Sequence, residues 1–579
     1  MNRILFVLIY LLLFLSGQLM AQKSSWILNL KLSRGEERVA WVHNRQGEKF
    51  RDTLLLKMRL DAMVGKLQGR GYLEAGVDTL VFDSDTAHVS LHLGQKYSVS
   101  RLTIENRENA TNEVDLQFRR KKAFRYNQFE EQLNRSLNGY LENGYPFAKL
   151  EPQKIDIEDY RVSGLWRIVS NPLFTWDSIQ VKGPVKLKQS FLQQYLGIQP
   201  GKRYQESRFQ KASERIGRLS FVRELKPPEV EFAQNKATVY TYLERQSANR
   251  FDGILGLLSN SSKDGKLEVT GELNLFLVNS FRRGEKISFN WQKLEAQTQR
   301  LSTSLQYPYL FNSMMGVDVG FRLHKQDTTY LNTEANLGVM FLSVGGNYLK
   351  LNVDIKNSSL LSTRFLQSQT VLPDFADSKS VLYGVELRYQ NIDYPLNPRK
   401  GWDLNASIGS GTKKIKRISQ LPESVYEGME LNSLLVDGQL DASYYFPLYR
   451  RWGMKLRTAG GFLHNSNLFE NDLYRLGGLK TIRGFDEELF RASAYVFLNG
   501  ELRYLPNRNS AFYLFWDGGG IRKEVLDVKQ EEYPWGVGMG MNFETGAGIF
   551  SLNYAVGKRK GVPLQIQSAK IHFGFVSRF

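Results

Sequence analysis

Ala569-Lys570-Ile571-His572-Phe573-Gly574-Phe575-Val576-Ser577-Arg578-Phe579 closes the chain. In an extended strand successive side chains point to opposite faces, so one face here carries Ile571, Phe573, Phe575 and Phe579. The opposite face carries His572, Gly574, Val576 and Arg578. A strand of a transmembrane barrel needs this pattern, because one face meets lipid and the other meets a wet lumen. The stretch therefore predicts the closing strand of such a barrel.

The same alternation extends from this strand back to Arg250, with turns supplied by Gly, Asn, Pro and Asp. Counting between the turns gives sixteen strands, and an even number is expected of a bacterial single-chain barrel. We therefore predict an all-β, 16-stranded antiparallel transmembrane β-barrel over residues 247–579. Its strands are expected to begin near Arg250, Gly265, Gly284, Thr298, Gly316, Tyr330, Asn347, Ser380, Gly401, Leu431, Trp452, Ser493, Ala511, Trp535, Ala547 and Ala569.

The lengths of the connections indicate a barrel with two different ends. Short connections, such as 447–451 and 544–546, follow even-numbered strands. If the first strand rises from the periplasm, connections after odd-numbered strands lie outside the cell and tolerate length. The long connections all follow odd-numbered strands, and they are 356–379, 411–430, 464–492, 519–534 and 557–568.

Three mixed α/β segments precede the barrel, over residues 22–95, 96–171 and 172–246. Apolar residues at helical spacing predict helices over Leu54–Leu67 and Phe129–Leu141. Each of these helices leads into a glycine followed by an aromatic residue, Gly71-Tyr72 and Gly144-Tyr145, as at a helix end that packs on itself.

The third segment has a strand over Phe174–Val181 and then the turn Gln199-Pro200-Gly201-Lys202-Arg203-Tyr204. A helix is expected next, with Phe209, Ala212, Ile216 and Leu219 on one face. The three copies share a β-α-α-β-β order, and arrays of such repeats are usually binding modules.

Residues 1–21 are predicted to be a secretory signal peptide, because Ile4–Leu15 is apolar yet too short to span a bilayer. An N-terminal anchor is the alternative. The chain has no cysteine, which excludes disulfides and thiolate metal sites. Its net charge of +18 fits a polar lumen and solvated loops. Contact of this basic surface with anionic lipid or lipopolysaccharide is the alternative.

One long connection carries the most distinctive motif, Leu476-Gly477-Gly478-Leu479-Lys480-Thr481-Ile482-Arg483-Gly484-Phe485. Three further motifs are Asn499-Gly500-Glu501-Leu502-Arg503, Phe515-Trp516-Asp517-Gly518-Gly519 and Tyr394-Pro395-Leu396-Asn397-Pro398-Arg399-Lys400-Gly401. The alternation in the strands places Glu501 and Asp517 in the lumen, on neighbouring strands. An arginine on a loop that folds back inside could bridge both carboxylates through its planar guanidinium.

Together these motifs resemble the superfamily of BamA and TamA, also called the bacterial surface antigen family, in which periplasmic POTRA domains precede an outer-membrane barrel. The first motif matches the family's loop-six motif, over Ile482, Arg483, Gly484 and Phe485. The resemblance assigns the bridging role to Arg483, with Glu501 and Asp517 as its partners. Three POTRA copies resemble the layout of TamA more than that of BamA.

The resemblance implies a protein that inserts or assembles outer-membrane proteins, with its barrel in the bacterial outer membrane and its POTRA domains in the periplasm. Unfolded clients would be received by the POTRA domains, and a periplasm-spanning or lipoprotein partner subunit is also implied. Client strands would pair at a weak seam between the first and last strands. We expect that seam at Phe251, Ile254, Leu258, Ile571, Phe573, Phe575 and Phe579.

No enzyme is predicted, because the sequence offers no nucleophile, phosphate loop or nucleic-acid module, and no cofactor or metal is expected. His88 and His92 share a strand face without a third ligand. Gly536, Gly538 and Gly540 lie in a strand with no helix after it, which favours close barrel packing over nucleotide binding. The rival function is a two-partner-type secretion pore that passes one dedicated exoprotein.

Overall fold

The computed structural model describes residues 26–32, 46–106, 114–117, 126–260, 266–293, 297–362, 373–395, 397–526, 528–545, 548–562, 564, 567 and 569–578. The predicted signal peptide and Phe579 lie outside the described residues. The chain divides into two compact units, Met1–Phe174 with Arg203–Glu206, and Thr175–Lys202 with Ser207–Phe579. In the described part of the chain, no helix has the length and apolarity that membrane spanning requires.

The first sheet has the strand order β2-β1-β4-β3 and packs against one helix. Its elements are β1 (Trp26–Leu32), β2 (Lys49–Phe50), α3 (Thr53–Gln68), β3 (Gly76–Asp83) and β4 (Thr86–His92). Strands β1 and β4 pair in parallel, and the other two pairings are antiparallel.

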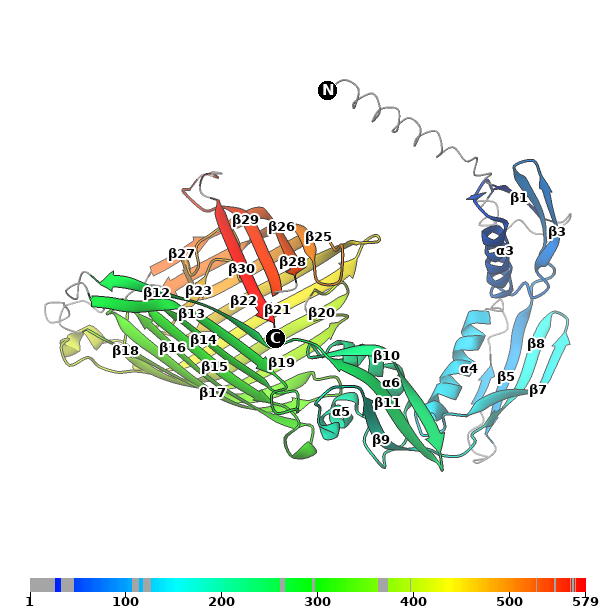
Figure 1. Cartoon of the computed structure of the whole chain (residues 1–579), viewed down its shortest axis with the longest axis horizontal. Coiled ribbons are helices and arrows are strands. Elements are labelled where there is room, and N and C mark those ends of the chain that lie inside the picture. Colours follow the sequence, from blue (N-terminus) through cyan, green and yellow to red (C-terminus); the bar gives the residue numbers. More distant parts are fainter. Residues whose placement is uncertain are drawn as a thin grey trace, which may run out of the picture. The chain divides into compact units, whose positions relative to one another are not determined.

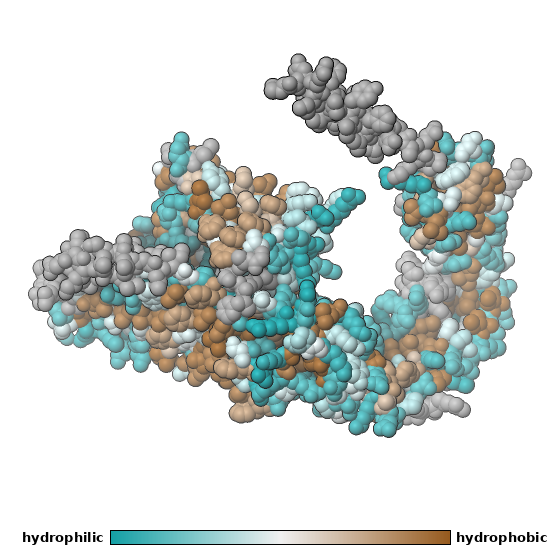
Figure 2. All heavy atoms as spheres, in the orientation of Figure 1, coloured by the Kyte–Doolittle hydropathy of each residue, from teal (hydrophilic) through white to brown (hydrophobic). Residues whose placement is uncertain are grey.

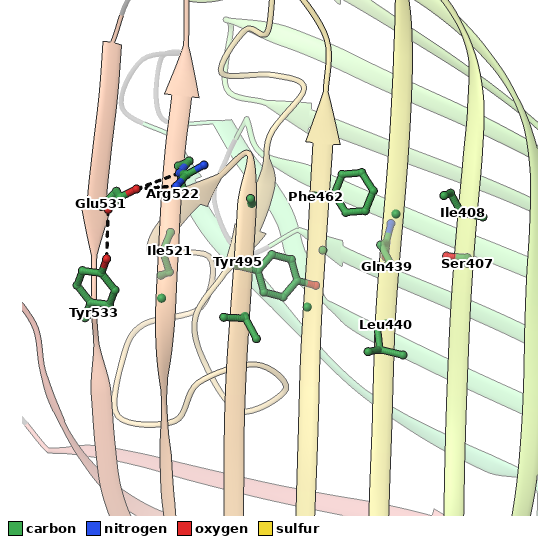
Figure 3. A pocket seen from close by; sticks show the side chains of 16 residues that line it. Ser407, Ile408, Gln439, Leu440, Phe462, Tyr495, Ile521, Arg522, Glu531 and Tyr533 are labelled. Carbon is green, nitrogen blue, oxygen red and sulfur yellow. Dashed lines mark hydrogen bonds and ion pairs between the residues drawn. The ribbon is translucent and has the colours of Figure 1, made fainter.

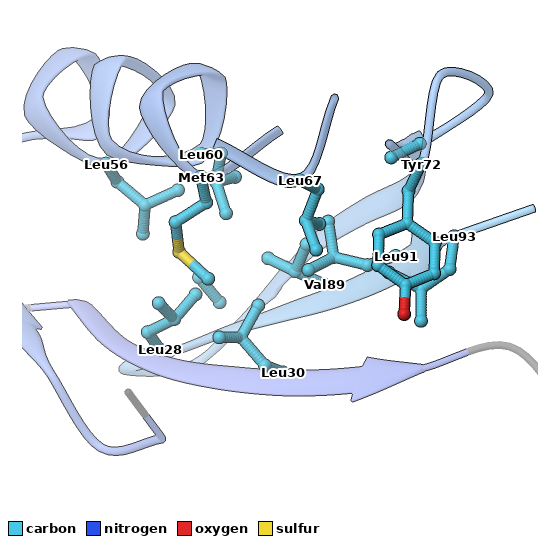
Figure 4. Packing of buried hydrophobic residues seen from close by; sticks show 12 residues of the cluster. Leu28, Leu30, Leu56, Leu60, Met63, Leu67, Tyr72, Val89, Leu91 and Leu93 are labelled. Carbon is cyan, nitrogen blue, oxygen red and sulfur yellow. The ribbon is translucent and has the colours of Figure 1, made fainter. Parts of the chain in front are cut away.

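Helix α3 forms because its start is capped and one of its faces is apolar. The Asp52 carboxylate accepts a hydrogen bond from the Leu54 backbone N–H at 3.0 Å, which satisfies a donor that the helix leaves free. The buried face of α3 then packs onto the sheet (Figure 4). This core contains Leu28, Leu30, Leu56, Leu60, Met63, Leu67, Tyr72, Val89, Leu91 and Leu93.

The second sheet repeats this plan with the order β6-β5-β8-β7. Its elements are β5 (Ser98–Asn106), β6 (Val114–Gln117), α4 (Tyr126–Leu141), β7 (Lys149–Glu158) and β8 (Arg161–Val169). Strands β5 and β8 pair in parallel, as β1 and β4 do. In both of these sheets the described residues show one helix after a short second strand. The sequence predicted two helices for each segment, and residues 33–45, 107–113 and 118–125, where another helix would fall, lie outside the described residues.

The third sheet has the order β10-β11-β9 and carries the predicted pair of helical segments. The elements are β9 (Thr175–Lys182), α5 (Gln189–Leu196), α6 (Glu206–Gln210), α7 (Ala212–Gly217), β10 (Val222–Ala233) and β11 (Lys236–Arg245). The helix predicted around residues 209–219 is present as the two short helices α6 and α7, which are separated at Lys211. Lys211 itself keeps right-handed helical dihedral angles, with φ −87° and ψ −1°.

The second half is a closed antiparallel barrel whose neighbouring strands are consecutive (Figure 1). The short strand β27 and strand β28 pair with different parts of β26, so together they take one strand position in the barrel. Counted in this way, the barrel has the predicted sixteen strands. Its strands are β12 (Arg250–Asn260), β13 (Lys266–Val278), β14 (Lys286–Lys293), β15 (Gln299–Tyr307), β16 (Met315–Gln326), β17 (Tyr330–Leu342), β18 (Tyr348–Leu360), β19 (Ser378–Ile392), β20 (Gly401–Ile415), β21 (Asn432–Pro447), β22 (Trp452–His464), β25 (Ala494–Tyr504), β26 (Ala511–Val525), β27 (Val528–Glu532), β28 (Trp535–Thr545), β29 (Gly548–Lys558) and β30 (Lys570–Arg578).

One predicted loop is wrong. Residues 519–534 were expected to form a long connection, but β26 continues to Val525 and β27 starts at Val528. Charged pairs link the two strands there, Arg522 with Glu531 at 3.0 Å and Lys529 with Glu524 at 2.6 Å. The strands therefore extend past the apolar band, where their polar residues resemble a loop in sequence.

Burial follows the predicted alternation. On β25, Val496 and Leu498 are both 51% exposed while Glu501 is 7% exposed. Much of the strand surface on the visible face is apolar, as lipid contact requires (Figure 2). At one end of the strands, aromatic rings gather, with Trp402 4.3 Å from Tyr444 between ring centroids, as in an interfacial girdle.

The third module contacts that same end of the barrel. The Lys188 N–H donates to the Arg282 carbonyl at 2.9 Å, and the Gly345 N–H donates to the Tyr195 carbonyl at 2.8 Å. Arg218 donates to the Gln390 carbonyl at 3.3 Å. All of these contacts fall on even-to-odd connections, so the third module lies at the end of the barrel that carries the short connections.

Candidate functional site: a luminal arginine and an open seam

The connection between β22 and β25 returns into the barrel as a small hairpin. Strand β23 (Tyr474–Leu476) pairs with β24 (Phe490–Ala492), and the predicted motif lies between them. The Thr481 hydroxyl closes the turn by accepting from the Gly477 N–H at 2.7 Å and donating to the Gly477 carbonyl at 2.8 Å. Ile482 and Phe485 are buried in a cluster with side chains of the wall, namely Phe497 and Ile521.

Arg483 lies at the centre of this site and bonds both predicted carboxylates. Its Nε donates to Asp517 Oδ2 at 2.7 Å and its Nη2 donates to Asp517 Oδ1 at 2.7 Å. Its Nη1 donates to Glu501 Oε1 at 2.9 Å, and its backbone N–H donates to Asp517 Oδ2 at 3.0 Å. The guanidinium also stands 3.6 Å from the centroid of the Phe515 ring. We call Arg483, Glu501 and Asp517 the clamp.

The clamp is nearly free of solvent, with Asp517 at 0% exposure and Arg483 and Glu501 each at 7%. Burial would lower the pKa of the Arg483 guanidinium, but hydrogen bonds and charge from Asp517 and Glu501 outweigh it and raise the pKa. The hydrogen bonds from the Arg483 guanidinium to the two carboxylates are therefore shielded from water, and charge-assisted bonds are strong in such surroundings.

The clamp continues to the periplasmic turn that the sequence also singled out. Arg503 approaches Glu501, with Nε 3.8 Å from Oε2. Its Nη1 donates to the Pro398 carbonyl at 2.9 Å, and its Nη2 donates to the side chain of Asn397. Hydrogen bonds and ion pairs therefore join four motifs that are separate in sequence into one network.

Two glycines of the wall make room for the motif. A Cβ on Gly536 would lie 2.2 Å from the Arg483 carbonyl oxygen, and one on Gly557 would lie 2.5 Å from the Gly484 carbonyl oxygen. Gly484 itself has a φ of +93°, which a residue with a side chain rarely adopts. Part of the glycine run is thus a slot for the loop, which is more specific than the smooth packing that the sequence predicted.

The rest of the connection is bonded around the inner wall. Lys413 forms an ion pair with Asp472, and Asn471 donates to Ser358. Further along, Glu488 accepts from Arg300 of β15 at 2.6 Å. Asp486 pairs with Lys570 of β30 at 2.6 Å. Since these wall residues point inward by the alternation of their strands, the loop occupies the lumen.

The first and last strands meet in a short junction. Among the described residues, β12 and β30 share two register pairs, Arg250 with Arg578 and Phe251 with Ser577. By contrast, β12 pairs with β13 through eleven residues and β29 pairs with β30 through eight. We call the junction of β12 with β30 the seam.

The predicted seam residues lie on these two strands. Phe251 is 50% exposed, Ile571 and Phe573 are each 69% exposed, and Phe575 is half-buried. The β12–β13 ladder places Ile254 opposite Glu272 and Leu258 opposite Glu268. The side chains of Ile254 and Leu258, like the whole of Phe579, lie outside the described part.

Sequence reasoning missed the residues that support the clamp. Lys455 lies 3.6 Å from Glu501, and Arg457 donates to the Lys480 carbonyl at 2.9 Å. The alternation along β22 places both side chains in the lumen, so the sequence could have predicted their position. The contacts of Gly536 and Gly557 depend on where the loop lies, and that position has no local signal in sequence.

Comparisons with known proteins agree with this architecture. A model of the Omp85 superfamily domain matches residues 279–579, and a POTRA model described as surface antigen variable number repeat matches residues 174–244. CdiB from Escherichia coli is similar over 91% of this chain and 98% of its own, at 13% identity and a TM-score of 0.50. Among curated proteins, none matches.

Two further solved structures are similar. CdiB from Acinetobacter baumannii matches 79% of this chain and 83% of its own, at 15% identity and a TM-score of 0.49. BamA from Haemophilus ducreyi lacking POTRA domains 1–3 matches 83% of this chain and all of its own, at 14% identity and a TM-score of 0.40. These likenesses concern the fold.

The Omp85 model covers more than half of the chain, and the barrel and POTRA module match the layout of that superfamily. The barrel therefore lies in the bacterial outer membrane, with the POTRA region in the periplasm. The chain belongs to the Omp85 superfamily.

Proposed function

We propose that this chain inserts or assembles other outer-membrane proteins. The observation that carries the proposal is the seam, where two register pairs join strands that are otherwise long enough for many more. Unpaired backbone groups in hydrocarbon are costly, so a client strand that pairs with β12 or β30 satisfies groups on both chains. The barrel edge then acts as a template for the client.

The periplasmic modules support the same proposal, with the first two sheets taken as further POTRA domains and the layout as TamA-like. Each sheet ends in an edge strand that exposes apolar side chains, and β-strand addition to such an edge is a common way to bind unfolded chains. Val81 on β3 is 56% exposed, Ile155 on β7 is 53% exposed and Leu225 on β10 is 57% exposed. Unfolded clients are therefore the proposed partners, and a lipoprotein or periplasm-spanning subunit would bring them.

A two-partner-type secretion pore is the rival, and cross-linking separates the two functions. A photo-reactive amino acid at Phe251 would sample the seam, and one at Ser302 on the inner face of β15 would sample the lumen away from the clamp. An inserting protein should give adducts from Phe251 to several barrel proteins. Adducts from Ser302 alone, to a single secreted polypeptide, would refute insertion and favour the pore.

A further inference from the structure

The outer rim of the barrel has a hollow on its lipid-facing surface. It extends from β20 across β21, β22, β25 and β26 to β27, has a volume of about 540 Å³ and is mostly apolar (Figure 3). The register explains its shape, because small outward residues stand between large ones. Gly460 is paired with Val496, and Val496 is paired with Gly520. Two residues nearer the outer end of these strands, Ala494 is paired with Phe462 on one side and with Arg522 on the other.

The floor of this hollow is open to the membrane. A Cβ added to Gly460 would meet only backbone atoms of Tyr495 and Val496 within 4 Å. The walls are side chains that point outward, with Leu440 42% exposed, Phe462 45% exposed and Val496 51% exposed. A flexible hydrocarbon chain fits a hollow of this kind.

The hollow lies where the apolar band ends. Going outward on β26, the lipid-facing residues change from Leu514 and Trp516 to Gly518, Gly520 and then Arg522. Arg522 donates to Glu531 at 3.0 Å, and the Tyr533 hydroxyl donates to the same carboxylate at 3.1 Å (Figure 3). This is the depth at which lipid acyl chains give way to head groups.

A second hollow of about 590 Å³ continues the first, since Glu531 and Tyr533 line both. It adds the basic residues Lys558, Arg559 and Lys560. Glu532 is paired with Arg559 at 3.2 Å. In the part of the chain that the structure describes, no carboxylate lies within ion-pair distance of Lys558 or Lys560. The Lys558 ammonium lies over the Trp535 ring, 6.0 Å from its centroid, so neither lysine has its charge neutralised by a described carboxylate.

We propose that the two hollows bind one lipopolysaccharide molecule, with an acyl chain over Gly460 and Ala494 and a lipid A phosphate at Lys558 and Lys560. Charge complementarity selects this occupant, because the rim faces the outer leaflet and the unpaired charges beside the apolar hollow are positive. The inference rests on the outer-membrane location and is independent of whether the protein inserts clients.

Native mass spectrometry of the folded full-length chain in detergent tests the site, with hexa-acylated lipid A and phosphatidylethanolamine as probes. The wild type should retain one lipid A at concentrations where phosphatidylethanolamine is lost. Ala494→Leu fills the first hollow and should weaken lipid A retention by about tenfold, equivalent to roughly 1.4 kcal/mol. Ala442→Leu, on a lipid-facing alanine of β21 outside the hollow, should change nothing.

The lysines are tested in the same way. Replacing Lys558 and Lys560 by Gln should weaken retention, whereas Lys529→Gln, at a rim lysine paired with Glu524, should not. If Ala494→Leu fails to fold, Val496→Phe fills the same hollow from its wall. Equal retention of both lipids, or equal retention of lipid A by wild type and the hollow-filling variant, would overturn the proposal.

Discussion

Arg483 is bonded through three guanidinium nitrogens and its backbone to carboxylates on two neighbouring strands. Taking these charges out of water is costly, and their mutual bonding offsets that cost. Removing the arginine leaves two buried carboxylates without their main partner, which costs about 3–5 kcal/mol for such pairs. The clamp therefore couples the position of the loop to the integrity of the wall.

We expect Arg483→Ala to release the hairpin while the barrel still assembles. Arg483→Lys should fall between alanine and wild type, because lysine keeps the charge but lacks the planar fork. Limited proteolysis of the folded protein measures the release as cleavage within 477–489. Arg417→Ala, at an exposed ion pair with Glu423, is the control. Protection of the loop in Arg483→Ala equal to that in wild type would contradict a structural role for the clamp.

Gly536→Ala and Gly557→Ala should disturb the same loop without touching any charge. In each variant the new methyl group meets a backbone oxygen of the motif at 2.5 Å or less, so the loop must move. Gly320→Ala is the matched control, since its Cβ would meet Asn336 at an ordinary 3.6 Å. Thermal unfolding should show lower stability for the first two variants only. Unchanged stability in all three would refute the role of Gly536 and Gly557 in making room for the loop.

At this scale the sequence predicted the parity of Glu501 and Asp517, because alternation along one strand is a local property. It could not predict Gly536 or Gly557, whose neighbours come from a segment about fifty residues or more away in the chain. The same limit applies to Arg503, whose contact with Asn397 joins two motifs across the barrel wall.

At the scale of elements, each of the sixteen predicted strands begins within two residues of its predicted start, and β27 is the barrel strand that was not predicted. Turn residues punctuate the alternation clearly, so boundaries are well marked. The predictions failed where the polarity of a segment does not indicate its secondary structure. The β26–β27 hairpin is charged because it extends beyond the lipid, and the apolar spacing over 209–219 does not reveal that α6 ends at Gln210 and α7 starts at Ala212.

The attachment of the third module is an element-scale feature that can be tested. Phe191 of α5 is 4% exposed and its ring lies 5.7 Å from that of Tyr309, in the turn before β16. Phe191→Ala should remove this packing, at a cost of about 3–5 kcal/mol for a buried phenylalanine. Hydrogen exchange should then rise in residues 279–285 and 308–314. Leu225→Ala, at an exposed leucine of β10, should leave those turns protected, and equal exchange in both variants would count against the attachment.

For the whole molecule, the fold class was predictable because strand count, connection lengths and repeats are all features of the full sequence. The weakness of the seam was implied by the resemblance and by Gly253 and Gly256 in the first strand, which reduce side-chain packing there. The position of the rim hollows was not predictable, because it depends on the register across six strands, from β20 to β27.

The sidedness of the whole molecule has its own test, made simple by the absence of native cysteine. Glu427→Cys, in the exposed connection after β20, should react with a membrane-impermeant maleimide on intact cells. Asn235→Cys, in the exposed turn between β10 and β11, should react only after the outer membrane is opened. Labelling of the Asn235 variant on sealed cells would reverse the topology.

We expect that the seam must open before a client can insert, and a reversible disulfide across the seam tests this. Phe251→Cys with Ser577→Cys joins register partners across the seam, and Phe251→Cys with Leu275→Cys joins register partners on the fully paired side of β12. In vesicles containing the purified protein, oxidation of the first pair should reduce insertion of an unfolded barrel client to background, and reductant should restore it. The second pair should insert clients normally under both conditions. Full insertion with the seam locked would show that clients do not need an open seam.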